Sequence, residues 1–224
     1  MPEYAQVETF VACDENTFAA VIPRFRQVLE SVQCTSPTVL DWLSHLDWPS
    51  WEEGFSMDYP TLLLQSQAEV FPARPYLLFP VSEGEERWAD WVELGILFEA
   101  EPLREAGFPF GPYDTPIVPY KVHAGNFIWR ILEAFAAVFL GNGVYFTDEL
   151  QDSRVGSVVR EGKGSFWLYS ASSPQFDAAI IPVELADHFR PIPELFEQIR
   201  LLGAVGVAAK GRFLALPWKA SPPV

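Results

Sequence analysis

Histidine is the side chain best suited to acid–base catalysis near neutral pH, and the chain has three: His45, His123 and His188. None belongs to a local catalytic motif, because the sequence contains neither a G-x-S-x-G elbow nor an H-E-x-x-H helix. His123 is the strongest candidate, since it follows Tyr120 and Lys121 and precedes a long apolar stretch. The alternative is a structural histidine whose ring bonds to backbone where a helix begins.

Acidic side chains near two other positions could bind a metal or exchange protons. Glu184 and His188 are four residues apart, with Asp187 between them, which suits two ligands on one helix face. A second group follows an expected strand: Asp148, Glu149 and Asp152. Zinc needs three or four protein ligands, so a polar helix face and an acidic turn explain these groups equally well. Phosphate-binding glycine patterns are absent, and we predict no metal and no cofactor.

Residues 47–60, DWPSWEEGFSMDYP, interleave aromatic and acidic side chains. Aromatic residues anchor protein interfaces, and neighbouring carboxylates pair with arginine or lysine of a partner. A second acidic stretch at 83–93 could extend the same surface. The predicted partner-binding residues are Asp47, Trp48, Trp51, Glu52, Glu53, Phe55, Asp58, Glu83, Glu85 and Glu86. The alternative is that the tryptophans fold inward and cap the core.

The acids of this chain are unevenly distributed. In 224 residues, 30 Asp and Glu face 15 Lys and Arg, a net charge of −15. Residues 1–110 hold 19 acids and five arginines, whereas residues 111–224 hold 11 acids and 10 bases. The sums are −14 and −1. Such a field steers cationic partners, although net charge also serves solubility. Direct binding to nucleic acid or to an anionic membrane is not expected without a basic patch.

Hydrophobic periodicity predicts the elements that position these residues. Strands are expected over 4–12, 62–70, 76–81, 91–99, 144–147 and 177–183, with a proline-rich turn at 71–75. Helices are expected over 14–33, 36–46, 126–140 and 192–202. Two hairpins are expected, one pairing 154–160 with 165–171 and one pairing 204–209 with 212–217. Strands therefore outnumber helices and do not alternate with them.

Local signals predict where the helices begin and end. Asp14, Ser36 and Asn126 are expected N-caps, and Gly141 is expected to end the 126–140 helix. Pro23 predicts a kink or a new helix within 14–33.

The pattern favours an α+β fold whose sheet is mainly antiparallel, with the 126–140 helix buried against it. We predict one domain over 1–224, with a possible weak boundary in the proline-rich segment 102–120. Cys13 and Cys34 are too few for a disulfide framework. The acidic N-terminus does not resemble a signal peptide, and no apolar run approaches the length of a membrane span. A cytoplasmic location is therefore expected.

Two functions fit these features. The first is a non-enzymatic acidic protein that sequesters or inhibits a basic protein partner. This general character is similar to that of small bacterial immunity proteins, a likeness of composition that no motif carries. The alternative is a hydrolase or transferase with its site near His123 and His188. A DNA-mimicking inhibitor and a structural subunit also remain open, but the modest charged fraction, 20%, argues against the mimic.

Overall fold

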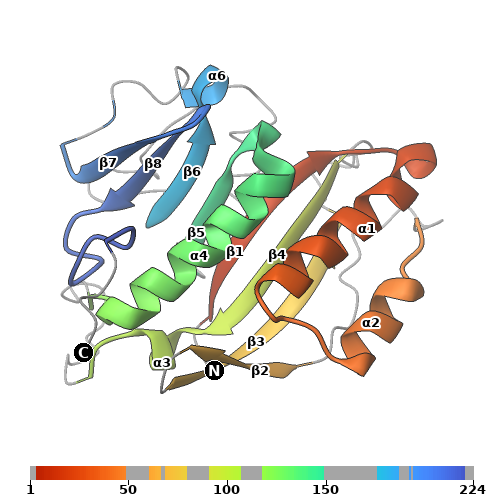
Figure 1. Cartoon of the computed structure of the whole chain (residues 1–224), viewed down its shortest axis with the longest axis horizontal. Coiled ribbons are helices and arrows are strands. Elements are labelled where there is room, and N and C mark those ends of the chain that lie inside the picture. The colour runs from red at the N-terminus through yellow and green to blue at the C-terminus, as the bar shows by residue number, and fades with distance from the viewer. Residues whose placement is uncertain are drawn as a thin grey trace, which may run out of the picture.

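Eight strands form one sheet in the computed structural model, in the order β2-β3-β4-β1-β5-β6-β8-β7 (Figure 1). Their bounds are β1 Tyr4–Ala12, β2 Leu62–Ser66, β3 Glu69–Leu78, β4 Trp91–Glu99, β5 Val144–Asp148, β6 Ala178–Pro182, β7 Phe196–Leu201 and β8 Ala204–Ala209. Every pairing between these strands is antiparallel. The structure describes residues 4–48, 61–66, 69–79, 91–106, 118–148, 176–186, 192 and 194–219. The predicted α+β class is confirmed.

Each half of the sequence builds one continuous half of the sheet. Strands from residues 1–110 occupy the positions β2-β3-β4-β1, and strands from residues 111–224 occupy β5-β6-β8-β7. The two halves meet where β1 pairs with β5, with Val7 opposite Phe146. The two halves of the sequence, which differ in net charge, therefore contribute their strands to opposite sides of the sheet.

Two long helices cross one face of the sheet (Figure 1). The helices are α1 Glu15–Ser31, α2 Pro37–Ser44, α3 Ala100–Leu103, α4 Val122–Phe139 and α6 Val183–Ala186, with a 3-10 turn, η1, at Leu140–Asn142. The central helix α4 packs on β5, β1 and β6 and along α1. The prediction that this helix is buried against the sheet is confirmed.

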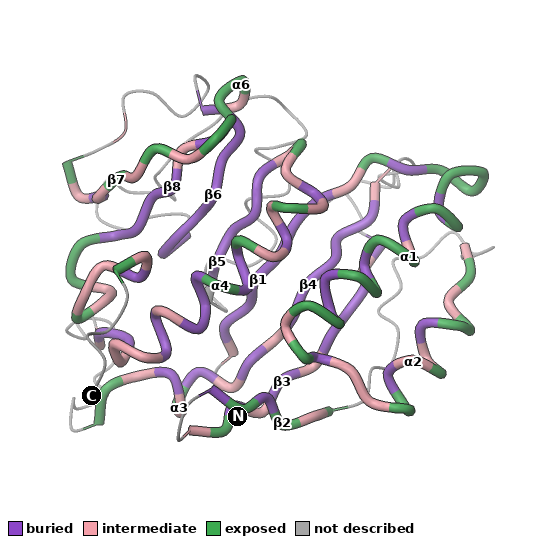
Figure 2. The backbone as a smooth tube through the Cα atoms, viewed as in Figure 1, coloured by how far each residue is buried: buried purple, intermediate pink, exposed green. Residues whose placement is uncertain are grey.

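The central strands are covered on both faces, as Figure 2 shows by their nearly continuous burial. One apolar cluster lies under the helices and includes Val7, Ile96 and Phe135. A second cluster, with Phe10 and Val207, lies on the opposite face. Because both faces are packed, the middle of the sheet can also bury polar side chains.

Several local predictions agree with the structure. Asp14 caps α1 through a capping box, in which its Oδ1 accepts from the Thr17 amide at 2.9 Å and Thr17 Oγ1 accepts from the Asp14 amide at 2.9 Å. Ser36 caps α2, its Oγ accepting from the Val39 amide at 3.1 Å. Pro23 is exposed and lies inside α1, which continues through it as one helix, so no second helix starts there.

The turn predicted at 71–75 is wrong, because these residues lie within β3. The N-terminal part of β3 pairs with β2 up to Ala73, and the rest pairs with β4 from Ala73 onward. Pro72 falls in the first part and Pro75 in the second, so each proline has a ladder partner on only one side. A residue without an N–H is tolerated in such a position.

The helix predicted over 192–202 is also wrong. Residues 196–201 form β7, which pairs with β8 around the tight turn Leu202-Gly203, where Gly203 has φ +72°. A glycine takes this left-handed conformation without steric cost. The ladder with β8 outweighs the weak local preference for helix.

The hairpin partner of β8 is therefore β7, and residues 212–217 form no strand. Phe213 instead makes isolated parallel bridges to Tyr120 and Lys210.

Helix α4 differs from its prediction at both ends. It begins at Val122, four residues before Asn126, and its N-cap is Lys121, without a side-chain cap hydrogen bond. At the other end the chain passes through η1, and Gly143, with φ +82°, makes the left-handed turn instead of Gly141.

The stretch Val122–Asn142 has a mean hydropathy of 1.3 in its most apolar window, enough in length and composition to span a membrane. Half of that window is buried inside the protein, as in the core helix of a globular fold.

Candidate functional site

Two of the ten predicted partner-binding residues, Asp47 and Trp48, lie within the described residues. The Trp48 ring packs edge-on against two buried rings, Phe18 at 5.7 Å and Phe79 at 5.2 Å between centroids. The exposed Asp47 accepts a hydrogen bond from the Trp48 amide through its Oδ1 at 2.8 Å. Trp48 therefore packs inward, as the alternative to partner binding predicted, and it attaches the start of the 47–60 segment to the core of the acidic half.

The other eight predicted residues lie outside the described residues: Trp51, Glu52, Glu53, Phe55, Asp58, Glu83, Glu85 and Glu86. Their role in binding stays a prediction. The hairpin expected over 154–171 also falls outside.

His123 lies in the first turn of α4 and faces Glu69, the first residue of β3. His123 Nε2 is 2.6 Å from Glu69 Oε2, and Lys121 Nζ is 3.4 Å from the same oxygen. The histidine contact is short but lacks the alignment of a hydrogen bond, and it is an ion pair when the ring is protonated. Phe71 stacks on the imidazole with 6.4 Å between ring centroids.

Glu69 is the electrostatic centre of this cluster. Partial burial by itself raises the pKa of Glu69, but contacts with His123 and Lys121 outweigh that effect and hold the pKa below its usual value of 4.5. The carboxylate also stands where the positive end of α4 favours an anion. The cluster therefore joins the β2–β3 hairpin to the start of α4.

The catalytic reading of His123 needs a nucleophile within its reach. In the described part of the chain, no Ser, Thr or Cys side chain is hydrogen-bonded to His123. His45 lies at the end of α2, far from His123 in the sequence. Its side chain is exposed, and its Nδ1 contacts the Asp41 carbonyl oxygen at 2.7 Å. His188 and Asp187 lie outside the described residues, so a site shared by His123 and His188 stays a prediction.

The structure also contains two buried acids, Glu8 and Glu93. Glu93 belongs to the acidic stretch 83–93 that was expected to extend the partner-binding surface, and its burial shows that this expectation is wrong for Glu93. Both lie in the acidic half, on the sheet face opposite the helices, and they are 0% and 2% exposed. Glu8 accepts from Gln6 Nε2 at 2.7 Å and from Thr147 Oγ1 at 3.3 Å. Glu93 accepts from the Tyr76 hydroxyl at 2.6 Å.

Strand register places these two carboxylates diagonally across adjacent strands, because Glu8 is opposite Gly95 and Glu93 is opposite Phe10. Burial and the negative charge of Glu8 raise the pKa of Tyr145, which keeps that phenol protonated. Period-two alternation along β1 predicts that Glu8 and Val7 point to opposite faces of the sheet. The sequence does not reveal that the face with Glu8 is covered.

A third polar cluster, in the other half of the sheet, centres on Asp177, which is fully buried. Its Oδ1 accepts from Arg212 Nε at 2.7 Å, and its Oδ2 lies 2.6 Å from Arg212 Nη2 and accepts from the Tyr120 hydroxyl at 2.7 Å. The bidentate pair joins the residue before β6 to the segment after β8 and to the start of α4. No local motif signals it, because its three members are far apart in the sequence.

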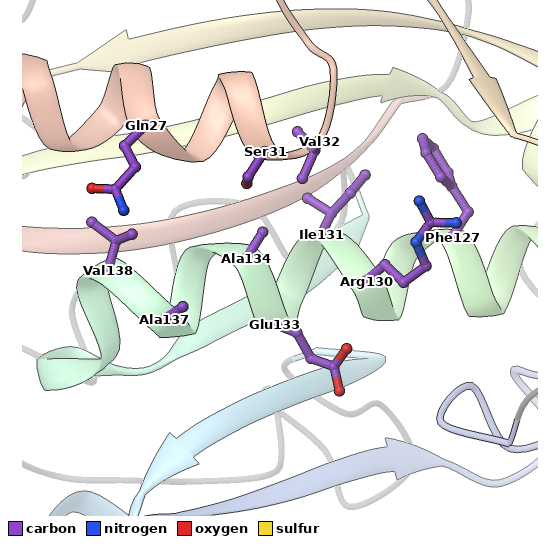
Figure 3. Close-up of a pocket in the computed structure, with 10 residues that line it drawn as sticks. All are labelled: Gln27, Ser31, Val32, Phe127, Arg130, Ile131, Glu133, Ala134, Ala137 and Val138. Carbon is purple, nitrogen blue, oxygen red and sulfur yellow. The ribbon is translucent and has the colours of Figure 1, made fainter.

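A groove of about 380 Å³ runs between α1 and α4 (Figure 3). Gln27 and Ser31 line it from α1, and Ala134 and Val138 line it from α4. Arg24 donates a hydrogen bond to the carbonyl of Val138, which lines the groove. The Arg24 guanidinium also lies over the Phe139 ring, 4.4 Å from its centroid. Among the described residues that line the groove, none is a histidine or cysteine and Glu133 is the one carboxylate.

Among the described residues, no group of three or more His, Cys, Asp or Glu side chains is placed to hold a metal ion. Comparison with family models, curated proteins and solved structures found no match to this chain.

Proposed function

We propose that this protein is a non-enzymatic binding protein that sequesters or inhibits a basic protein partner. One observation carries the proposal: strands from the half of the sequence with net charge −14 lie side by side as β2-β3-β4-β1, and helices α1 and α2 belong to the same half. Charge grouped in this way creates a directional field, which an even distribution of the same charge would not do.

Exposed acids among the described residues contribute to this field. Two arginines of the same half contact other side chains. The exposed acids are Asp14, Glu15, Glu30, Asp41, Asp47, Glu101 and Glu105. Arg26 pairs with Glu30 at 2.7 Å, and Arg74 donates to the Tyr4 hydroxyl at 2.7 Å. A basic partner would be attracted first by the field and then held by the aromatic segment that follows Trp48.

The proposal is tested with the partner itself. The protein is used to capture binding proteins from lysate of its source organism, and the captured protein is purified for association-rate measurements. We expect a basic protein whose association rate falls at least tenfold, on the order expected for electrostatic steering, between about 50 mM and about 500 mM salt. Capture of an acidic partner, or a rate that does not depend on salt, would contradict the proposal.

A matched pair of double variants locates the field. Glu52→Gln with Glu53→Gln removes two charges from the predicted binding segment, and Glu184→Gln with Glu194→Gln removes two from the nearly neutral half. We expect the first pair to slow association several-fold, roughly the effect of removing rim charges, and the second to leave it almost unchanged. Equal effects of the two pairs would mean that only the total charge matters.

One contact favours a second function, a hydrolase or transferase that uses His123. Its ring is held against the Glu69 carboxylate at 2.6 Å, and a carboxylate can orient a catalytic histidine. Replacing His123 by Ala should abolish any esterase or phosphatase activity measured with chromogenic model esters. If purified wild-type protein does not accelerate their hydrolysis, this second function loses its support for these ester classes.

A further inference from the structure

The two edges of the sheet have different chemistry. The terminal strand β2 has the sequence LLLQS, with no charged residue and no proline, whereas the other terminal strand, β7, has the sequence FEQIRL. Glu197 of β7 pairs with Lys210 Nζ at 3.5 Å, and Arg200 is exposed. Charged residues and prolines on edge strands prevent unwanted pairing with other chains. Edge β7 has such protection in its sequence, and edge β2 does not.

Apolar side chains accompany the unprotected edge. Leu63 is 69% exposed and Val70, on the adjacent strand β3, is 49% exposed. Leu64 and Phe71 belong to the cluster under the helices, so alternation directs Leu63 and Val70 to the opposite face. Leu63 pairs with Pro72, and Gln65 pairs with Val70, which makes Leu63 and Val70 diagonal neighbours. The edge thus presents a strand with an apolar patch beside it.

Charge decides which chain could use this edge. Strand β2 is the outermost strand of the half with net charge −14. A second copy of this protein, docked edge to edge, would bring two such halves together against their mutual repulsion. An extended segment rich in lysine or arginine would be attracted to the same place.

We propose that β2 is a docking strand, to which an extended basic segment of the protein partner adds as a further antiparallel or parallel strand. This inference rests on the proposed function and assigns the contact surface for it. Backbone hydrogen bonds to β2 would supply affinity. Alternate side chains of the segment would cover Leu63 and Val70, and basic side chains would face the acidic half.

A synthetic peptide of about ten residues with alternating lysine and valine is a suitable probe, because it has the length and pattern of an extended strand. Its control is the same peptide with alternate backbone amides N-methylated, which keeps the charge but removes strand hydrogen-bond donors. Binding is measured by calorimetry, and exchange of the β2 amides is followed by hydrogen–deuterium exchange.

Two protein variants match each other in charge, and each replaces an exposed leucine. Leu63→Lys places a cation on the proposed docking edge, and Leu202→Lys places one on the β7–β8 turn, where Leu202 is fully exposed at 102%. We expect Leu63→Lys to weaken peptide binding about tenfold or more, because a charge on an edge strand opposes strand addition. Leu202→Lys should change the affinity less than twofold.

Strand addition also predicts loss of binding by the N-methylated peptide and slower exchange of β2 amides when the unmodified peptide is bound. Equal binding of both peptides, or equal effects of the two lysine variants, would overturn the docking strand. A concentration-dependent dimer of the wild type that Leu63→Lys abolishes would also overturn it, since a second copy would then occupy the edge.

These results separate the two proposals. Salt-dependent association with a basic partner that is unaffected by Leu63→Lys would retain the binding function and remove the docking strand. Peptide binding that depends on Leu63, together with a partner whose association ignores salt, would retain the docking strand and remove the charge-steered function.

Discussion

The two halves of the sheet share an architecture and differ in charge. Each contributes four strands, and helices cover the same face of both (Figure 1). Folding therefore does not require a difference of −14 against −1, because the nearly neutral half builds an equivalent set of strands. Solubility would be served equally well by an even distribution of charge. The uneven distribution of acids along the sequence is therefore the basis of the proposal that a basic partner approaches the acidic half.

The buried polar groups of the two halves also differ. Asp177, in the neutral half, is joined to a full cation through Arg212. Glu8 and Glu93, in the acidic half, accept hydrogen bonds that include those from Gln6, Thr147 and Tyr76. The first arrangement connects distant chain segments, and the second connects neighbouring strands.

The largest expected effect is the loss of the Asp177–Arg212 pair. Asp177→Asn keeps the shape of the side chain but leaves the guanidinium without its buried counter-charge, and it should lower the free energy of unfolding by about 3 kcal/mol. The control, Lys210→Ala, breaks the half-exposed pair with Glu197 and should cost less than about 1 kcal/mol. Urea unfolding measures both. Similar small losses would show that the buried pair does not hold the neutral half together.

The central glycines of the two halves give the next comparison. A Cβ on Gly95 would lie 2.5 Å from both the Val7 carbonyl oxygen and Tyr76 Cε1, whereas a Cβ on Gly206 would meet side chains, Ile199 Cγ2 and Trp129 Cη2, at 2.6 Å. Backbone cannot move aside as a side chain can. We expect Gly95→Ala to cost about 3 kcal/mol of unfolding free energy and Gly206→Ala about 1 to 2 kcal/mol. Thermal unfolding of the two variants tests the order, and the reverse order would contradict it.

Strong local signals predicted much of this fold. The bounds of β1 and β4, the caps at Asp14 and Ser36, and the buried helix α4 all follow from periodicity and capping chemistry. The errors occur where distant pairing outweighs local preference. Residues 196–201 become a strand because β8 pairs with them, and Phe71–Pro75 stay extended because each proline has one open side.

The candidate site was less predictable. The contact between His123 and Glu69 joins residues 54 positions apart in the sequence, and no spacing rule connects them. Glu93 was expected on an acidic surface and Glu8 was not singled out, because only the covered second face of the sheet makes them buried. The sequence did locate the charge asymmetry, but strand order was needed to show that the strands of each half lie side by side.

Acid should weaken the Glu69 cluster, which joins the acidic half to the first turn of α4. The pKa of Glu69 is lower in the folded protein than its usual value of 4.5, so its contribution to stability is present above that pH. The contribution is lost as the pH falls through the lower, folded pKa. Wild type should therefore lose more unfolding free energy than Glu69→Gln between about pH 6 and about pH 3.

Urea midpoints across this range measure the difference. The same substitution at the exposed Glu194 is the control and should give a pH dependence parallel to that of wild type. If Glu69→Gln also runs parallel to wild type, the His123 and Lys121 contacts do not stabilise the fold.

The smallest expected effect comes from single exposed acids, and it tests the charge comparison directly. Like charges repel within the acidic half, so Glu105→Gln should raise the free energy of unfolding by up to about 0.5 kcal/mol at low salt. Glu194→Gln, which removes the same charge from the nearly neutral half, should change it by less. At about 500 mM salt the two variants should become equal to wild type, because the Debye length is then only a few ångströms. Equal stabilisation by both variants at low salt would mean that the protein responds to its total charge alone, and the division into two electrostatic halves would then have no energetic consequence.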